Sequence, residues 1–277
     1  MKVKKRVKRV IPGFGISMGV TVTMLSLVVL IPMASLIIVT SKLDMSQFLK
    51  IITSKEVLSS YEVSLTCALI AAVINCIFGV ILSWVLVRYE FPGKRILDGL
   101  IELPFALPTA VAGISLTSLY SDKGWIGSWF AQFGIKIAYT RIGIIIAMIF
   151  IGIPFVVRAI QPVLEKLDQQ YEEAAYMLGA NGTRTFFKVI FPEILPAMLT
   201  GFGLALARGI GEYGSVVFIA GNIPYKTQIA PLLIMSKLEQ FNYSDATAIA
   251  LVLLVFSFLL LLINNAFQVY MNRITSN

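Results

Sequence analysis

Residues 63–87 read VSLTCALIAAVINCIFGVILSWVLV, an apolar run that holds no charged side chain. A helix needs about 20 predominantly apolar residues to cross the hydrocarbon core of a bilayer, so this run is long enough to span one. The rest of the chain agrees, because 57% of its 277 residues are hydrophobic and only 14% are charged. Soluble proteins carry about 25% charged residues. The composition therefore excludes both a soluble globular domain and a disordered chain.

Further apolar stretches of similar character occur on both sides of this run. They are continuous rather than alternating with polar residues, which excludes an outer-membrane barrel. Pro12 and Pro32 predict a late start or a kink in the first stretch. We therefore predict an all-α polytopic membrane protein with six transmembrane helices, residues 1–277 forming one transmembrane domain. The predicted spans are 11–40, 63–87, 100–120, 142–157, 194–220 and 246–270.

The distribution of basic residues predicts which side of the membrane each connection faces. Lysines and arginines concentrate at the N-terminus, between Lys2 and Arg9, and in the connections after the second and fourth spans. The positive-inside rule then places both termini in the cytoplasm. The first apolar run is too long for the h-region of a signal peptide, so we expect an uncleaved first span. The net charge of +8 is explained by topology and anionic lipid, and we expect no nucleic-acid partner.

Several kinds of chemistry are missing from the sequence. Histidine is absent, which removes histidine metal ligands and Ser-His-Asp triads. Cys67 and Cys76 are nine residues apart in one apolar run and fall on opposite helical faces, so a disulfide between them is not expected. No G-x-x-x-x-G-K-[ST] motif occurs, so this chain cannot hydrolyse ATP by the P-loop route. We expect no metal, no cofactor and no enzyme activity in this chain.

The connection between the fourth and fifth spans carries its own helical pattern. Asp168 can cap a helix whose residues 171, 174, 175 and 178 form one apolar stripe. Gly179 is a predicted stop, and Asn181-Gly182 is typical of a turn. A second short helix is predicted from near Thr183 to just before Pro192. The stripe fits either a docking surface for a cytoplasmic partner or packing on this chain and the lipid interface.

The same connection resembles the EAA loop of ABC importer permeases, whose pattern is EAA, three residues, Gly, nine residues and I-x-L-P. Two apolar replacements, Val189 for Ile and Phe191 for Leu, preserve its character. The resemblance implies a coupling loop at about 164–193 that inserts into a groove on an ATP-binding subunit. The residues that carry the pattern are Glu173, Ala174, Ala175, Gly179, Val189, Phe191 and Pro192.

A narrower resemblance covers most of the chain. The stretches LPFALPTAVAG at 103–113 and ARGIGEYG at 207–214 are similar to the T-type subunit of sulfate/thiosulfate ABC permeases. The molybdate/tungstate permease is a close alternative. The resemblance implies the type I importer fold shared with methionine and molybdate permeases, in a bacterial inner membrane or, alternatively, a plastid envelope. It also implies a second, W-type permease subunit, two ATP-binding subunits that use ATP and Mg, and an external sulfate/thiosulfate-binding protein.

Two opposite charges fall within the predicted fifth span. Arg208 and Glu212 are four residues apart on one helical face and can offset each other. One interpretation is an ion pair that joins helices. The other is that Arg208 lines the path of an oxyanion, which a guanidinium recognises through its fork of donors. The residues alone leave both open.

A secondary transporter driven by an ion gradient is a further alternative, although reading by eye finds no internal repeats. An intramembrane enzyme is disfavoured because no nucleophile–base pair is evident.

Overall fold

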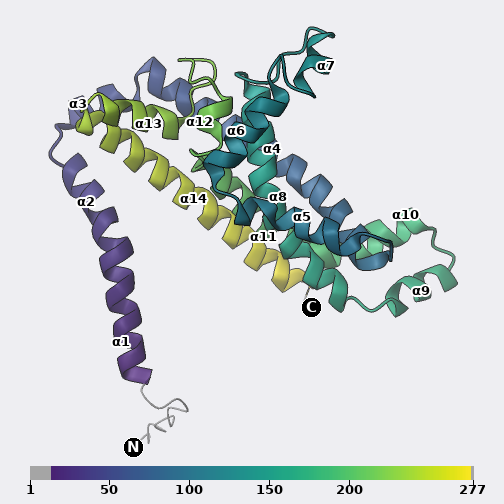
Figure 1. The fold of residues 1–277 in the computed structure, drawn as a ribbon. Helices are drawn as coiled ribbons and strands as arrows, with labels where there is room; N and C mark the ends of the chain where they lie inside the picture. Colours follow the sequence, from purple (N-terminus) through teal and green to yellow (C-terminus); the bar gives the residue numbers. More distant parts are fainter. Residues whose placement is uncertain (1–13, 276–277) are drawn as a thin grey trace, which may run out of the picture.

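The computed structural model describes residues 14–275 and places helices, and no strands, within them (Figure 1). The elements in order are α1 (Phe14–Leu25), a π-helical segment (Ser26–Leu30), α2 (Ile31–Thr40), α3 (Met45–Ile52), α4 (Lys55–Arg88), α5 (Lys94–Ala106), α6 (Thr109–Tyr120), α7 (Gly127–Ala131), α8 (Arg141–Lys166), α9 (Gln170–Met177), α10 (Gly182–Thr185), a second π-helical segment (Phe186–Ile190), α11 (Phe191–Ile210), α12 (Val216–Ile219), α13 (Ala230–Glu239) and α14 (Tyr243–Thr275).

Helices α4, α8 and α11 form the core of the bundle, and α14 packs on α11. Small residues bring their backbones close together. A Cβ on Gly201 would lie 2.7 Å from the Val156 backbone, and one on Gly209 would lie 3.2 Å from Ala68. Such close approaches are the usual basis of helix association in membranes, where apolar burial gives little drive. Fully buried side chains of this core include Val63, Ile144, Val156, Ile160, Leu164 and Ile194.

The predicted third span, 100–120, is wrong as a single helix. The chain forms α5 and α6 instead, bent by 114° at Leu107 and Pro108. Proline lacks an N–H and forces the preceding residue out of the helical region, and Leu107 accordingly has φ −83° and ψ 136°. The pair still traverses the bundle. Phe105 at the end of α5 packs on Phe155 near the middle of α8, whereas α6 packs on α12, next to the start of α8.

The first half of this broken span, α5, is fixed by charge. Arg158 of α8 contacts both Asp98 and Glu102 of α5, each at 2.8 Å. The sequence placed Arg158 in a loop, but α8 continues as a helix to Lys166. The predicted fourth span, 142–157, was therefore too short at its C-terminal end.

The predicted fifth span, 194–220, also differs from the structure. Helix α11 ends at Ile210, and residues up to Ala220 form a turn and the short helix α12. At the other end, the predicted stop before Pro192 is wrong, because residues Gly182–Ile210 form one continuous helix. The chain therefore enters this span earlier, and leaves it earlier, than the hydropathy indicated.

A π-helical segment explains how the helix continues through Pro192. The backbone N–H of Phe191 donates to the carbonyl of Phe186, five residues back. The wider turn relieves the clash that proline makes with the carbonyl four residues before it. The same arrangement precedes Pro32, where the N–H of Ile31 donates to Ser26. Pro32 is thus accommodated without a break, whereas Pro12 and the basic cluster from Lys2 to Arg9 lie outside the described residues.

Helix α1 extends away from the bundle (Figure 1), whereas α2 contacts α14, and Thr40 is the sole buried residue of α1 and α2 in the described part of the chain. Helices α3, α7, α12 and α13 lie at one end of the bundle, and α9 and α10 project from the other (Figure 1).

Candidate functional site

The segment that carries the EAA pattern is folded by local capping. The Asp168 carboxylate accepts a hydrogen bond from the N–H of Gln170 at 3.0 Å and so caps the start of α9, as predicted. Gly179 has φ +79° after the end of α9, where glycine avoids the strain that a Cβ would cause. The Asn181 side chain accepts from the N–H of Arg184 at 2.9 Å and caps α10. The predicted stop at Gly179 is therefore confirmed. The turn predicted at Asn181-Gly182 is wrong, because Gly182 already begins α10 and Asn181 is its N-cap.

Helix α9 presents an uncovered surface. Glu173, Ala174 and Gly179 are exposed, and Ala175 is half-buried. Apolar side chains lie beside them, and Met177 and Leu178 are each 89% exposed. A patch of this kind at the end of a monomer is typical of an interaction site.

The second part of the EAA pattern lies on a different element. Val189, Phe191 and Pro192 are half-buried in the helix that continues into α11. The Phe191 ring lies 6.1 Å from that of Phe186 and 6.0 Å from that of Phe187. These residues therefore pack at the start of α11 and do not extend the exposed surface of α9.

The sequence interpretation missed a contact between α4 and the EAA segment. Arg88, the last residue of α4, contacts Glu172 at 2.7 Å, and their side chains are 10% and 15% exposed. Glu172 lies in the first turn of α9, where a carboxylate is also favoured by the helix dipole. Nothing in the spacing indicated this partner, because 84 positions separate the two residues.

The predicted intramembrane ion pair is present at the end of α11. The Arg208 Nη1 lies 2.5 Å from Glu212 Oε2, with the arginine side chain 35% exposed and the glutamate 1% exposed. Arg208 lies in the last turn of α11 and not in the middle of a span. The negative end of the helix dipole also stabilises a cation at this position. Glu212 Oε1 accepts from the N–H and the hydroxyl of Ser215, at 2.8 and 2.9 Å. One buried carboxylate therefore fixes both Arg208 and the turn before α12.

The two sequence stretches with the narrower resemblance pack against each other. A Cβ on Gly113 in α6 would lie 2.8 Å from the Ser215 Cα and would collide with the Ser215 carbonyl. A Cβ on Gly214 would lie 3.0 Å from the Thr109 Cβ. Gly113 is thus required by the close approach of the Ser215 backbone, and Gly214 by that of the Thr109 side chain.

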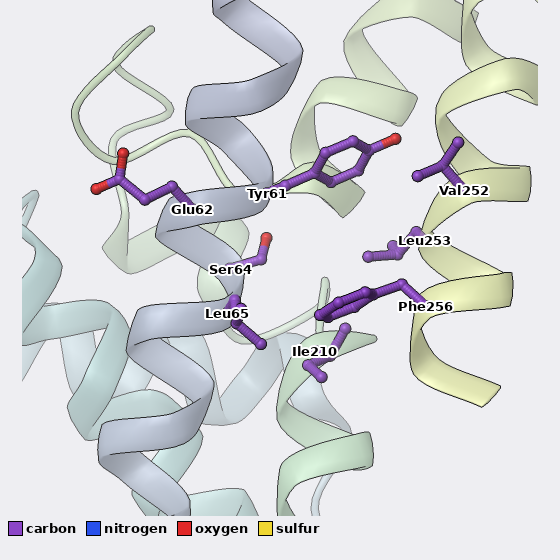
Figure 2. A pocket seen from close by; sticks show the side chains of 8 residues that line it. All are labelled: Tyr61, Glu62, Ser64, Leu65, Ile210, Val252, Leu253 and Phe256. Atoms are coloured by element: carbon purple, nitrogen blue, oxygen red, sulfur yellow. The ribbon is translucent and has the colours of Figure 1, made fainter. Parts of the chain in front are cut away.

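A cavity of about 210 Å³ lies between α4, α11 and α14 (Figure 2). Its lining is almost wholly apolar, and the Glu62 carboxylate points away from it (Figure 2) and contacts Arg141 at 3.3 Å. The Tyr61 hydroxyl donates to the Ile249 carbonyl at 2.9 Å. The hydroxyl of Ser64, which also lines the cavity, accepts from the N–H of Ala230 at 2.8 Å. The nearly apolar lining is therefore poorly suited to an oxyanion. Among the described residues, no group of three or more His, Cys, Asp or Glu side chains is placed to hold a metal.

Comparison with known families places this arrangement in a class. Residues 76–276 match the family described as binding-protein-dependent transport system inner membrane component. The chain belongs to this family of multi-pass inner membrane permeases.

Relatives within the family are similar over almost the whole chain. The sulfate transport system permease protein CysT of Escherichia coli is 46% identical over 261 residues, 94% of each chain. The protein of the same name from Synechocystis is 48% identical over 92% of this chain and 89% of the relative. A probable sulfate permease cysT from Nephroselmis olivacea is 50% identical over 86% of this chain and 84% of the relative.

Solved structures agree on the fold. A bacterial ABC transporter that imports alginate aligns with a TM-score of 0.74 at 14% identity, covering 90% of this chain and 92% of that one. The MetNI methionine ABC transporter aligns with a TM-score of 0.59 at 14% identity, covering 83% and 99%. These likenesses confirm the predicted type I importer fold.

Proposed function

We propose that this chain is the membrane-spanning permease subunit of an ATP-driven sulfate importer. The observation that carries the proposal is the 46% identity to a sulfate permease over 94% of both chains. Relatives at 46–50% identity bear the same name, which favours sulfate over the molybdate/tungstate alternative. Thiosulfate, a second sulfur oxyanion of the same charge, remains part of the proposed substrate class.

Uptake of labelled sulfate tests this proposal directly. The chain is produced with its partner subunits in a strain that lacks its own sulfate permeases, and uptake is measured against unlabelled sulfate, thiosulfate and molybdate. We expect competition by sulfate and thiosulfate. Strong inhibition by molybdate together with none by thiosulfate would contradict the proposal and support the molybdate alternative.

Six membrane crossings with both termini in the cytoplasm fit this role. Support comes from five helices long and apolar enough to cross a membrane, together with the α5–α6 pair, which passes from one end of α8 towards the other. Six crossings return the chain to its starting side, and the basic residues near α9 favour that side as the cytoplasmic one. We assign the protein to a bacterial inner membrane, with a plastid envelope as the alternative. Cysteine labelling from outside at Met177→Cys, which we expect to fail in intact cells, tests the orientation.

An external source of energy is required by the charge of the substrate. Moving a dianion into a negative-inside cell costs about 4.6 kcal/mol at 100 mV, before any concentration gradient. We propose that a partner ATPase supplies this from ATP and Mg, and that it docks on the exposed surface of α9 at Glu173, Ala174, Ala175 and Gly179. Val189, Phe191 and Pro192 support that surface.

Co-purification with the ATPase subunit tests the docking. We expect Glu173→Lys and Gly179→Asp to abolish co-purification and uptake. The matched control is Glu90→Lys, a charge reversal at the same end of the molecule on a side chain 87% exposed. Retained uptake in both docking variants would favour a secondary transporter instead.

The proposed assembly contains a second, W-type permease subunit, two ATP-binding subunits and an external sulfate/thiosulfate-binding protein. Support is general. The alginate transporter with this fold was crystallised in complex with an alginate-bound periplasmic protein. Mass measurement of the intact detergent-solubilised complex tests the stoichiometry.

Arg208 is our candidate for contact with the anion in the membrane. Its side chain is 35% exposed, so part of the guanidinium is accessible while Glu212 offsets its charge. A partly neutralised arginine attracts an oxyanion without holding it tightly. The alternative is a purely structural ion pair, and the double variant Arg208→Gln with Glu212→Gln separates the two. Folded protein with little uptake supports the anion path, whereas folded protein with normal uptake supports the structural pair.

A further inference from the structure

The end of α4 is tied to the EAA segment by one side chain. Arg88 Nη2 donates to Glu172 Oε1 of α9 at 2.7 Å and to the carbonyl of Leu167 at 3.2 Å. Leu167 is the residue that follows α8. A single nitrogen therefore joins the end of α4 to both the start of the loop and the first turn of α9. The pair is largely buried, so it is less screened than an ion pair on the surface.

The same arginine belongs to a chain of aromatic contacts that leads to α11. Its guanidinium carbon lies 5.7 Å from the centroid of the Trp84 ring, one turn earlier in α4. The Trp84 ring meets Phe186 edge to face at 5.8 Å. Phe186 begins the π-helical segment that leads into α11. The contacts Glu172, Arg88, Trp84 and Phe186 thus connect α9 with α4 and with the start of α11.

Two adjacent glutamates on α9 face different surroundings. Glu172 points toward Arg88 and is 15% exposed, whereas Glu173 is exposed on the outer surface. The inner glutamate fixes the helix to its own chain and leaves the outer one free for a partner. Apart from this contact, the main packing of α9 is on the helix that begins at Gly182.

We propose that Arg88 is a positioning residue that fixes α9 to the cytoplasmic ends of α4 and α11, so that a displacement of α9 moves both spans together. The proposal rests on the proposed function in one respect, since it assigns the displacement to the docked ATPase. Its structural half, the fixation of α9 by Arg88, concerns this chain alone.

The mobility of α9 tests the structural half without any partner. A spin label is placed at Met177→Cys, in a background with Cys67→Ala and Cys76→Ala, and the full chain is reconstituted in nanodiscs. We expect Arg88→Met to narrow the lines of the electron paramagnetic resonance spectrum, because α9 loses its contact with α4 and the label moves faster. Arg88→Lys should restore part of the line broadening. One nitrogen of Arg88 donates both hydrogen bonds, and a lysine ammonium can donate both as well. Lys94→Met, which removes a cation from an exposed pair at the same end, should change nothing. An unchanged spectrum in Arg88→Met would overturn the proposal.

The ratio of sulfate transported to ATP hydrolysed tests whether a displacement of α9 is passed to α4 and α11. In proteoliposomes that contain the complete complex, we expect Arg88→Met to retain ATP hydrolysis but to lower this ratio about tenfold, within the range of ordinary coupling factors. Arg88→Lys should recover part of it. A normal ratio in Arg88→Met refutes transmission through this contact. If the unsubstituted chain itself transports no sulfate, the proposed function fails, and the spin-label result still decides whether Arg88 fixes α9.

Discussion

One arginine–glutamate pair holds the turn that follows α11, and another holds α9, in the loop between α8 and α11. The two pairs differ in how far apart their members lie in the sequence. Arg208 and Glu212 lie four residues apart, and the glutamate also caps its own turn through Ser215. Arg88 and Glu172 come from distant parts of the chain and join two elements across an otherwise exposed loop. The first pair closes a local turn, whereas the second holds α9 against the end of α4. The same pair of residue types therefore stabilises a turn where it closes a short stretch, and joins two elements where its members are distant in the sequence.

The largest effect is expected where the carboxylate is fully buried. Glu212→Leu leaves Arg208 without its partner and removes the acceptor for Ser215, so we expect a loss of about 3 kcal/mol of stability. Thermal unfolding of the purified protein, followed by size-exclusion chromatography, measures it. The variant Glu212→Gln, which retains an acceptor for Ser215, should lose less. An unchanged melting temperature in Glu212→Leu would show that the turn does not depend on this side chain.

The packing of α6 on the same turn should rank second. Gly113→Ala places a Cβ against the Ser215 backbone, and we expect it to cost about 2 kcal/mol through overpacking. Gly99→Ala in α5 is the matched control, since nothing lies within 4 Å of the added Cβ. In the control, alanine should be neutral or slightly stabilising, because it favours a helix by about 1 kcal/mol over glycine. Equal melting temperatures in the two variants would contradict the close approach.

A smaller and more local effect is expected in the loop. Gly179→Ala imposes a left-handed conformation on alanine, at a cost of about 1 kcal/mol. Because α9 is tied to the bundle by few contacts, we expect the change to appear as faster hydrogen exchange in residues 167–181 with little shift in global unfolding. Gly182→Ala, whose added Cβ has only an ordinary contact with Tyr176, is the control. A global loss of stability instead would erase the distinction between loop and turn.

The smallest effect sets the baseline for both pairs. Glu90→Gln breaks the contact with Lys94, in which the glutamate is 87% exposed, and should change stability by less than about 0.5 kcal/mol. The same thermal unfolding assay applies. A loss comparable to that of Glu212→Leu would mean that burial does not separate the strong pairs from the weak ones.

The sequence predicted whatever depends on local pattern. Composition and long apolar runs indicated the fold class, and capping residues such as Asp168 and Gly179 indicated the boundaries of α9. The Arg208–Glu212 pair followed from its spacing of four. The sequence failed where backbone strain or distant packing decides. Hydropathy alone did not show that Pro108 breaks a span, that Pro192 does not, or that Arg88 meets Glu172.

The π-helical segment before Pro192 also has a rotational consequence. Such a segment adds one residue to a turn, and each residue turns a helix by about 100°. In the continuous helix Gly182–Ile210, the faces of α10 are therefore rotated by about that angle from where an uninterrupted α-helix would place them. Deletion of a single residue between Phe186 and Ile190 would swing α10, and α9 with it, around the axis of the span. The direction in which α9 and α10 project from the bundle thus depends on one extra residue, at a distance from the surface that it orients.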